Sequence, residues 1–507
     1  MIRRCKIAIR GTVQGIGFRP FVYKLAHEKK LNGYVLNTST GVDIEVEGES
    51  PQIDLFIEAV RSNRIPLARI EDMRLSALEI RKDQGFVIRE SVSKAEKLTS
   101  IPPDIGICED CLKELQDPAD RRYRYPFINC TNCGPRYTII EDIPYDRPST
   151  SMRSFRMCSD CTREYTDPFN RRFHAQPNAC PVCGPRVMLC GKDRKALPAE
   201  DPIASAVDLI EKGHILAVKG LGGFHLAADA ENSLAVKRLR ERKHREEKPL
   251  ALMAYDMDSI RRFAHASPEE EALLTFPSRP IVILRKLVPN RISPEVSPRN
   301  RNFGVMLPYT PLHYLLLEGG LTALVMTSGN ASREPICIDN DDAFERLGGI
   351  ADFFLVHNRD IYLRADDSIV RRIDLGNRMI RHARGYAPSP VYLKADFPQI
   401  LACGPETANT VCLTKGKHAF ISQHIGDLTN LESLRSFEQT ISHLKRIFDI
   451  EPALVAYDLH PDYLSTRYAL KVENVKKIGI QHHHAHIASC MAEHGIEGPV
   501  IGLAFDG

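Results

Sequence analysis

The sequence predicts a multidomain protein that combines α+β and α/β folds. Three observations lead to this expectation. The chain has 507 residues, too many for one hydrophobic core, which suggests three or four domains. Residues 104–190 contain two copies of a cysteine-rich unit. On both sides of this unit, short β-rich runs alternate with segments whose pattern is typical of helices.

Residues 1–92 are expected to form a small α+β sandwich. Their pattern is a strand, a glycine-rich loop, a helix, two strands, a second helix and closing strands, an order that packs two helices on one sheet. The expected positions are strands at residues 6–10, 34–36, 42–46 and near Met73 and Phe86, with helices starting at Pro20 and Gln52. A polar linker is expected at residues 91–103.

The cysteine-rich unit is an internal duplication. Both copies contain two C-x2-C pairs, and each also carries Asp-Pro, Arg-Arg and Gly-Pro-Arg. Such self-similarity at a fixed period indicates a repeated structural unit. The cysteines are Cys108, Cys111, Cys130 and Cys133 in the first copy and Cys158, Cys161, Cys180 and Cys183 in the second.

Two such pairs of thiolates can close a tetrahedral site that leaves no position for a substrate, so we expect two structural zinc ions. Disulfides are the alternative. The chain opens with Met-Ile-Arg-Arg-Cys-Lys and no apolar signal region, so we expect a cytoplasmic protein with reduced thiols. Whether the pairs combine within or across repeats stays open. Zinc modules often bind nucleic acid, but residues 101–190 hold 12 Lys and Arg against 12 Asp and Glu, which argues against that partner.

Residues 200–388 mix β-rich runs with charged helices, which predicts an α/β unit. The runs are residues 214–219, 280–285 and 323–327, and the Pro-containing segment 387–390 marks a boundary. No apolar stretch reaches the ~20 residues that would span a membrane. Residues 397–507 form the last unit, in which 499–505 reads as a buried strand and Asp506-Gly507 as a turn out of it. We expect this unit to lack a C-terminal portion.

Three segments could carry chemistry. The loop 11–19 could bind an anion with its backbone N–H groups and with Arg19, or it could be a plain glycine turn. The segment 237–248 holds seven Lys and Arg against three Glu, and a solvated helix face is the alternative to a binding site. His482 and His486 are four residues apart and could share a metal, although histidine runs also occur on plain surfaces.

The first two segments resemble known families. The loop 11–19 with Asn37 resembles the acylphosphatases, which implies a ferredoxin-like fold in which Arg19 binds the acyl phosphate and Asn37 the attacking water. Residues 219–225 and the basic segment, with residues 327–330, resemble the YrdC/Sua5 family, which makes carbamoyl-type adenylates from ATP. This resemblance implies that ATP, with magnesium, is bound by Lys243, Arg245, Lys248, Ser328 and Asn330.

The last unit resembles the Kae1/TsaD carbamoyltransferases, which have an actin-like fold. The match rests on the H-x3-H pattern and on Asp506-Gly507, which resembles the start of their phosphate-binding turn. It implies a further divalent metal at His482 and His486.

In this order, the four units resemble the HypF family of carbamoyltransferases, which act in the maturation of nickel–iron hydrogenases. The resemblance implies a ligase-type enzyme that opens carbamoyl phosphate to carbamate and uses ATP to form carbamoyl adenylate. The carbamoyl group then passes to the C-terminal cysteine of the partner HypE as the precursor of cyanide ligands. Two alternatives are a threonylcarbamoyl-type tRNA modification enzyme and a non-enzymatic zinc scaffold.

Overall fold

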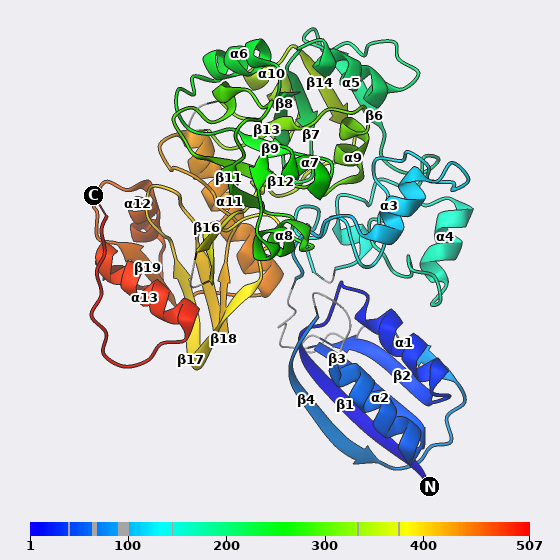
Figure 1. Ribbon diagram of the computed structural model, residues 1–507. Helices are drawn as coiled ribbons and strands as arrows, with labels where there is room; N and C mark the ends of the chain where they lie inside the picture. The colour runs from blue at the N-terminus through cyan, green and yellow to red at the C-terminus, as the bar shows by residue number, and fades with distance from the viewer. Residues whose placement is uncertain are drawn as a thin grey trace.

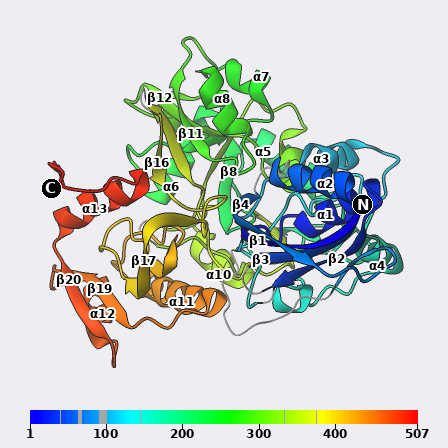
Figure 2. The same ribbon diagram turned by 90° about the horizontal axis from the view of Figure 1, so that it is seen from below.

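The computed structural model describes residues 1–38, 41–62, 68–89, 101–143, 145–331, 334–373 and 376–506. Most of the expected linker at 91–103 lies outside these ranges. The cysteine module lies between the first unit and the unit with the large sheet, and the last unit lies on another side of the large-sheet unit (Figures 1 and 2). Backbone hydrogen bonds join the module to the large-sheet unit: Ile107 N–H donates to Tyr309 O at 3.1 Å and Gly106 N–H to Pro277 O at 2.8 Å.

The first unit is the expected α+β sandwich. Its strands lie in the order β4-β1-β3-β2-β5, and α1 and α2 pack together on the sheet (Figure 1). Alternate strand residues such as Ile7, Val35 and Ile44 point into a core that also buries Val22 and Phe56 of the helices. The elements are β1 (Ile2–Thr12), α1 (Phe18–Glu28), β2 (Asn32–Thr38), β3 (Gly41–Glu49), α2 (Ser50–Ser62), β4 (Arg69–Leu78) and β5 (Phe86–Ile88).

The cysteine module contains little regular structure. Each copy has one short helix, α3 (Glu109–Gln116) or α4 (Ser159–Thr166), with η1 (Arg147–Ser149) between them. Cys108 and Cys158 occupy the N-cap positions of the two helices. The strand β6 (Val187–Gly191) stands at the end of residues 104–190, the range expected for the cysteine module. It pairs with β14 (Phe353–His357) of the large sheet, so the module continues directly into the next unit.

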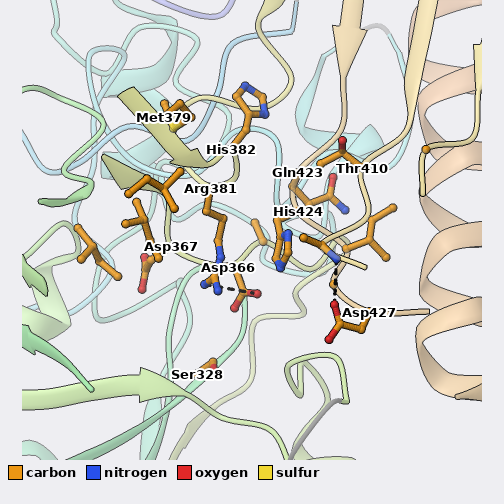
Figure 3. A pocket seen from close by; sticks show the side chains of 18 of the residues that line it. Ser328, Asp366, Asp367, Met379, Arg381, His382, Thr410, Gln423, His424 and Asp427 are labelled. Carbon is orange, nitrogen blue, oxygen red and sulfur yellow. Dashed lines mark hydrogen bonds and ion pairs between the residues drawn. The ribbon is translucent and has the colours of Figure 1, made fainter. Parts of the chain in front are cut away.

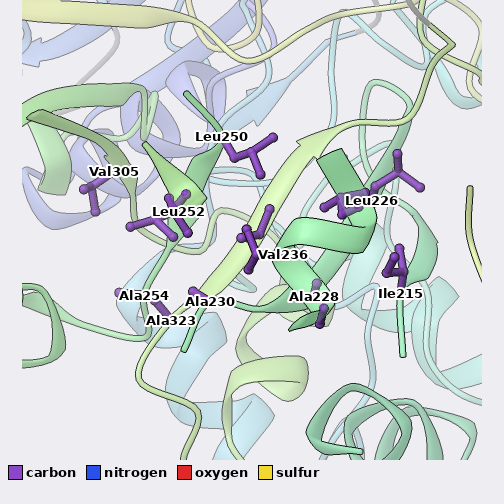
Figure 4. Packing of buried hydrophobic residues seen from close by; sticks show 14 of the residues in the cluster. Ile215, Leu226, Ala228, Ala230, Val236, Leu250, Leu252, Ala254, Val305 and Ala323 are labelled. Atoms are coloured by element: carbon purple, nitrogen blue, oxygen red, sulfur yellow. The ribbon is translucent and has the colours of Figure 1, made fainter. Parts of the chain in front are cut away.

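The third unit is built on a large mixed sheet with the order β16-β15-β11-β12-β9-β13-β8-β7-β14-β6. Successive residues of its strands enter two different cores: Leu226 and Ala228 belong to one core, and Ala227 between them belongs to the other. Both faces of the sheet are therefore buried, which explains why its strands are almost continuously apolar. Figure 4 shows Val236 of α6 packed near Leu226 and Leu252 in the first of these cores.

The strands of this unit are β7 (Leu216–Lys219), β8 (Phe224–Asp229), β9 (Ala251–Met253), β10 (Ala264–His265), β11 (Ile281–Lys286), β12 (Asn302–Met306), β13 (Leu324–Ser328), β14 (Phe353–His357), β15 (Ile369–Ile373) and β16 (Gly376–Arg381). Its helices are α5 (Pro202–Glu211), α6 (Ser233–Lys243), α7 (Met257–Arg261), α8 (Pro268–Thr275), η2 (Pro294–Val296), α9 (Pro311–Leu317) and α10 (Asn340–Leu347).

The last unit has a sheet with the order β18-β17-β19-β20 and a long helix, α11, whose apolar side is buried. Its elements are β17 (Pro390–Ala402), β18 (Cys412–Ile421), α11 (Leu431–Phe448), β19 (Leu454–Asp458), α12 (Leu464–Lys471), β20 (Lys476–Ile480) and α13 (His482–His494). Within the described ranges, no helix is both long and apolar enough to cross a membrane.

The prediction of a buried strand at residues 499–505 is wrong. The segment has no regular secondary structure, and Ile501 and Phe505 are 96% and 95% exposed. An isolated apolar run becomes a strand only when a neighbouring strand accepts its backbone hydrogen bonds. In the part of the chain that the structure describes, no strand pairs with this segment.

Candidate functional site

The eight predicted cysteine ligands form two separate four-sulfur clusters, each within one repeat. Neighbouring Sγ atoms lie 3.5–3.8 Å apart in the first cluster and 3.7–3.8 Å apart in the second. Four sulfurs at about 2.3 Å from a tetrahedral zinc would be about 3.8 Å from one another, so the spacing fits the ion. The thiols are free of disulfides, and pairing within each repeat answers the question that the spacing alone left open.

Each cluster receives arginines from the other repeat. Arg121 of the first copy donates to Cys161 Sγ at 3.0 Å, and Arg171 of the second copy donates to Cys111 Sγ at 3.2 Å. The neighbouring Arg122 and Arg172 pair with glutamates on the same helices as those cysteines. A zinc ion with four thiolates carries a net negative charge, so these reciprocal cations offset the charge of the opposite site.

Arg19 and Asn37 lie near the same end of the first unit. Arg19 is in the first turn of α1, after Gly17 in a left-handed conformation, and Asn37 is near the end of β2. Gln14 links the two regions because its side-chain amide donates to Thr38 O and Gly41 O, both at 2.7 Å. Asn37 is 8% exposed, and its Oδ1 has no hydrogen-bond partner among the described residues. This acceptor is buried and unpaired, and a buried polar atom of this kind needs a partner such as a bound water or ligand.

Arg19 is partly buried. Burial lowers the pKa of Arg19, and the charges of Asp146 and Tyr165 in the cysteine module oppose that shift. The loop therefore faces the cysteine module. No local sequence pattern indicates this contact. A partly desolvated guanidinium binds an anionic ligand more strongly than an exposed one.

The predicted nucleotide-binding segments also contact one another through hydrogen bonds. Lys243, at the end of α6, is 5% exposed, and its Nζ donates to Ser328 O, Asn330 O and Asn330 Oδ1, each at 2.7 Å. Arg245 donates to Thr327 Oγ1 at 3.0 Å. The alternative of a solvated helix face therefore does not hold for Lys243. Burial lowers the pKa of this lysine to about 7, with a further contribution from the charge of Arg245.

The predicted histidine pair gains a third member. His482 and His486 lie on one side of α13, and their Nε2 atoms lie 3.2 Å apart. Asp506 Oδ2 lies 2.7 Å from His482 Nε2 and 2.9 Å from His486 Nε2, and Asp458 contacts the other ring nitrogen of His482. Two imidazoles and a carboxylate form a suitable ligand set for a divalent metal, and a carboxylate behind a ligating histidine orients its ring. Gly507 lies outside the described residues.

A single cavity of about 1650 Å³ brings the last two sites together. Its lining includes Lys243, Arg245, Lys248, Ser328 and Asn330 from the large-sheet unit, and His482 and His486 from the last unit. Figure 3 shows the side chain of Arg381 directed toward Asp366, with Ser328 below this pair and Asp427 to the right of it. Asp366, Arg381 and Asp427 also line the cavity, and no sequence motif indicates them, because isolated charged residues in strands and loops carry none.

Comparisons with known proteins agree with this arrangement. The chain matches the families described as Acylphosphatase over residues 5–88, HypF finger over 107–140 and 157–190, Telomere recombination (Sua5, YciO and YrdC) over 208–383, and HypF Kae1-like domain over 395–493. A probable carbamoyltransferase HypF of Methanocaldococcus jannaschii is 41% identical over 517 residues, covering 99% of this chain and 67% of that protein. The chain belongs to the HypF carbamoyltransferase family.

Other HypF proteins support the same assignment. Carbamoyltransferase HypF2 of Cupriavidus necator is 48% identical, covering 99% of this chain and 65% of that protein. The crystal structure of full-length HypF in the phosphate- and nucleotide-bound form matches with a TM-score of 0.95 at 48% identity, over 100% of this chain and 66% of that one. HypF of T. kodakarensis matches with a TM-score of 0.89 at 44% identity, over 98% and 64%.

The predicted fold class, with its acylphosphatase, zinc-finger, YrdC-like and Kae1-like units, is thereby confirmed. The chain spans 65–66% of the length of the first three curated HypF relatives.

Proposed function

We propose that this chain is an ATP-dependent carbamoyltransferase that acts on carbamoyl phosphate in hydrogenase maturation. The observation that supports this most is the shared cavity, which is lined by Lys243 of the YrdC-like unit and by His482 and His486 of the Kae1-like unit. A carbamoyl adenylate formed on one side could react on the other without entering bulk water. Because acyl adenylates hydrolyse readily, exclusion of water favours transfer.

The first step would take place at the loop 11–19. Arg19 would bind the phosphate oxygens of carbamoyl phosphate, and Asn37 Oδ1 would hold the attacking water. The P–O bond to the carbamoyl group breaks, and the products are inorganic phosphate and carbamate. This reaction corresponds to the acylphosphatase-type activity of the first unit.

The second step would take place beside β13. A carbamate oxygen attacks the α-phosphorus of ATP, and pyrophosphate leaves. Lys243, Arg245 and Lys248 would offset the negative charge of the phosphates, together with magnesium. Ser328 Oγ donates to Asn330 Oδ1 at 2.9 Å, which supports this part of the pocket as a positioned binding surface.

The third step would transfer the carbamoyl group to the C-terminal cysteine of HypE, which yields a thiocarbamate and AMP. His482, His486 and Asp506 would hold a divalent metal, which supplies positive charge to nucleotide oxygens when bound. Asp458 would orient His482 for that role. The carbamoylated cysteine is the proposed precursor of the cyanide ligands, and the reaction as a whole belongs to the ligase type.

The test is exchange of labelled pyrophosphate into ATP. We expect exchange by this chain only when carbamoyl phosphate is present, and loss of exchange in Lys243→Met. An exposed control on the same helix, Lys237→Met, should exchange like the wild type. Absence of exchange under all conditions would favour the zinc-scaffold alternative. Exchange that needs threonine and bicarbonate instead of carbamoyl phosphate would favour the tRNA-modification alternative.

A further inference from the structure

Arg136, in the Gly-Pro-Arg segment of the first repeat, joins the first zinc site to the loop 11–19. Its guanidinium is buried and donates to five backbone carbonyls. Nε donates to Gly15 O at 3.0 Å. The other two nitrogens donate to Cys130 O, Thr131 O, Cys133 O and Pro135 O at 2.8–3.3 Å. A guanidinium has five N–H donors, so every one of them is used here.

The loop also packs directly on the segment 130–133, which we call the zinc knuckle because Cys130 and Cys133 are ligands of the first cluster. Gly17 has φ +78°, and a Cβ at this position would lie 3.2 Å from both Thr131 Oγ1 and Asn132 Oδ1. Thr131 and Asn132 are the two residues between those ligand cysteines. The loop therefore has close contacts with the knuckle in addition to the Arg136 hydrogen bond.

We propose that Arg136 is a positioning residue for the acyl-phosphate site, an inference that rests on the proposed function of the loop. In a trans peptide the C=O and the following N–H point in opposite directions. The hydrogen bond from Arg136 to Gly15 O therefore also sets the direction of the Ile16 N–H, one of the groups with which such a loop can bind an anion. Cys130 and Cys133 would hold a zinc ion in the first cluster, and the bound ion would fix the knuckle against the same loop.

The duplication provides a matched control. Arg186 occupies the same place in the second repeat as Arg136 in the first, but its side chain is exposed. Its backbone N–H donates to Asn358 Oδ1 at 2.8 Å, an interaction that a side-chain substitution leaves in place. Arg136→Ala and Arg186→Ala thus remove the same side chain from equivalent sequence positions with different contacts.

The experiment compares the full chain with Arg136→Ala, Arg136→Lys and Arg186→Ala. For each protein we would measure the zinc content, hydrogen–deuterium exchange of residues 11–19, and kcat/KM for carbamoyl-phosphate hydrolysis. We expect at least tenfold lower kcat/KM and faster exchange in Arg136→Ala, a smaller change of the same sign in Arg136→Lys, and wild-type values in Arg186→Ala. If Arg136→Ala does not fold, Arg136→Lys decides the question.

Exchange and kcat/KM in both Arg136 variants within twofold of the wild type would overturn the inference. An equal loss in Arg186→Ala would also overturn it, because the effect would then be a general consequence of removing an arginine from the module. Failure of the proposed function is a separate result. If Arg19→Ala hydrolysed carbamoyl phosphate normally, the assignment of the acyl-phosphate site would be wrong. Hydrogen–deuterium exchange of residues 11–19 would still test whether Arg136 positions the loop.

Discussion

Arg121 of the first repeat lies 3.0 Å from the Sγ of Cys161 in the second repeat, and Arg171 makes the reciprocal contact with Cys111 at 3.2 Å. Each four-sulfur site is therefore built from the cysteines of one copy and receives a cation from the other, which would partly offset the negative charge of a bound zinc ion. The two copies are expected to behave as one unit, in which a change in one copy affects the metal in the other.

Arg171→Ala should loosen zinc in the first cluster, although the substitution lies in the second repeat. A charge-assisted hydrogen bond contributes about 1.5–3 kcal/mol, and the lower value corresponds to about tenfold faster zinc loss. Release to a chromophoric chelator measures the effect. Arg163→Ala removes a 75% exposed arginine of the same repeat and should release zinc at the wild-type rate. Equal rates in the two variants would contradict the reciprocal arrangement.

Cys130→Ser should lose one of two zinc ions per chain. The first cluster would keep three sulfurs, too few to close a tetrahedral site, and the folding free energy that the ion supplies would be lost with it. Metal analysis of reduced protein and thermal unfolding measure these effects. Iron–sulfur absorbance in the wild type, or an unchanged zinc content in the variant, would show that the cluster assignment is wrong.

Arg19→Ala should abolish carbamoyl-phosphate hydrolysis while the chain still folds. The guanidinium is partly desolvated, so its removal relieves a cost in the empty protein and removes a contact of about 2–5 kcal/mol in the transition state. Phosphate release measures activity, and circular dichroism measures folding. Glu28→Ala, at an exposed position of the same helix, is the control. Normal phosphate release by the Arg19 variant would contradict the assignment.

Nucleotide affinity should fall as pH rises above 7. Burial lowers the pKa of Lys243 from 10.5 to about 7, so the empty site loses this charge above pH 7, whereas bound phosphates require it. The dissociation constant should then rise about tenfold per pH unit. At pH values between about 7 and 10.5, Lys243 is protonated to a greater extent in the unfolded chain than in the folded protein. The contribution of Lys243 to the free energy of unfolding of the empty protein therefore increases with pH.

Calorimetric titration with ATP at pH 6.5, 7.5 and 8.5 measures the dependence. An arginine stays protonated across this pH range. In Lys243→Arg, the pH dependence of the dissociation constant that comes from the protein should therefore disappear, and only the dependence that comes from the ionisation of ATP should remain. Parallel pH dependences in the two proteins would show that Lys243 is not the titrating group.

Asp506→Asn should weaken binding of an added divalent ion by about tenfold or more, because the carboxylate completes the ligand set of His482 and His486. Competition between the protein and a chelator for added zinc measures the constant. Asp462→Asn removes a charge from an exposed aspartate in the same unit and is the control. Equal affinities in the two variants would exclude Asp506 as a ligand.

The sequence was informative about local elements and weak about contacts between units. The strands and helices of the first unit were predictable because apolar residues alternate over a fixed period and glycine or proline ends each run. The same reasoning failed at residues 499–505, because an apolar run does not contain the neighbouring strand that it needs. The local charge of the segment 237–248 did not reveal that Lys243 is buried, since burial depends on what packs over it.

The sequence by itself determined the four-unit organisation, the duplicated cysteine pattern and the pair of histidines on one side of a helix. All of these depend on spacing along the chain, which secondary-structure periodicity and ligand geometry constrain. Only the tertiary structure decided which cysteines combine, that Arg121 and Arg171 cross between repeats, that Arg136 contacts Gly15, and that Lys243 and His482 line one cavity. The cysteines of each cluster lie within one repeat, whereas the other three relationships join residues 40 to 239 positions apart in the numbering, and they form only when repeats or separate units pack together.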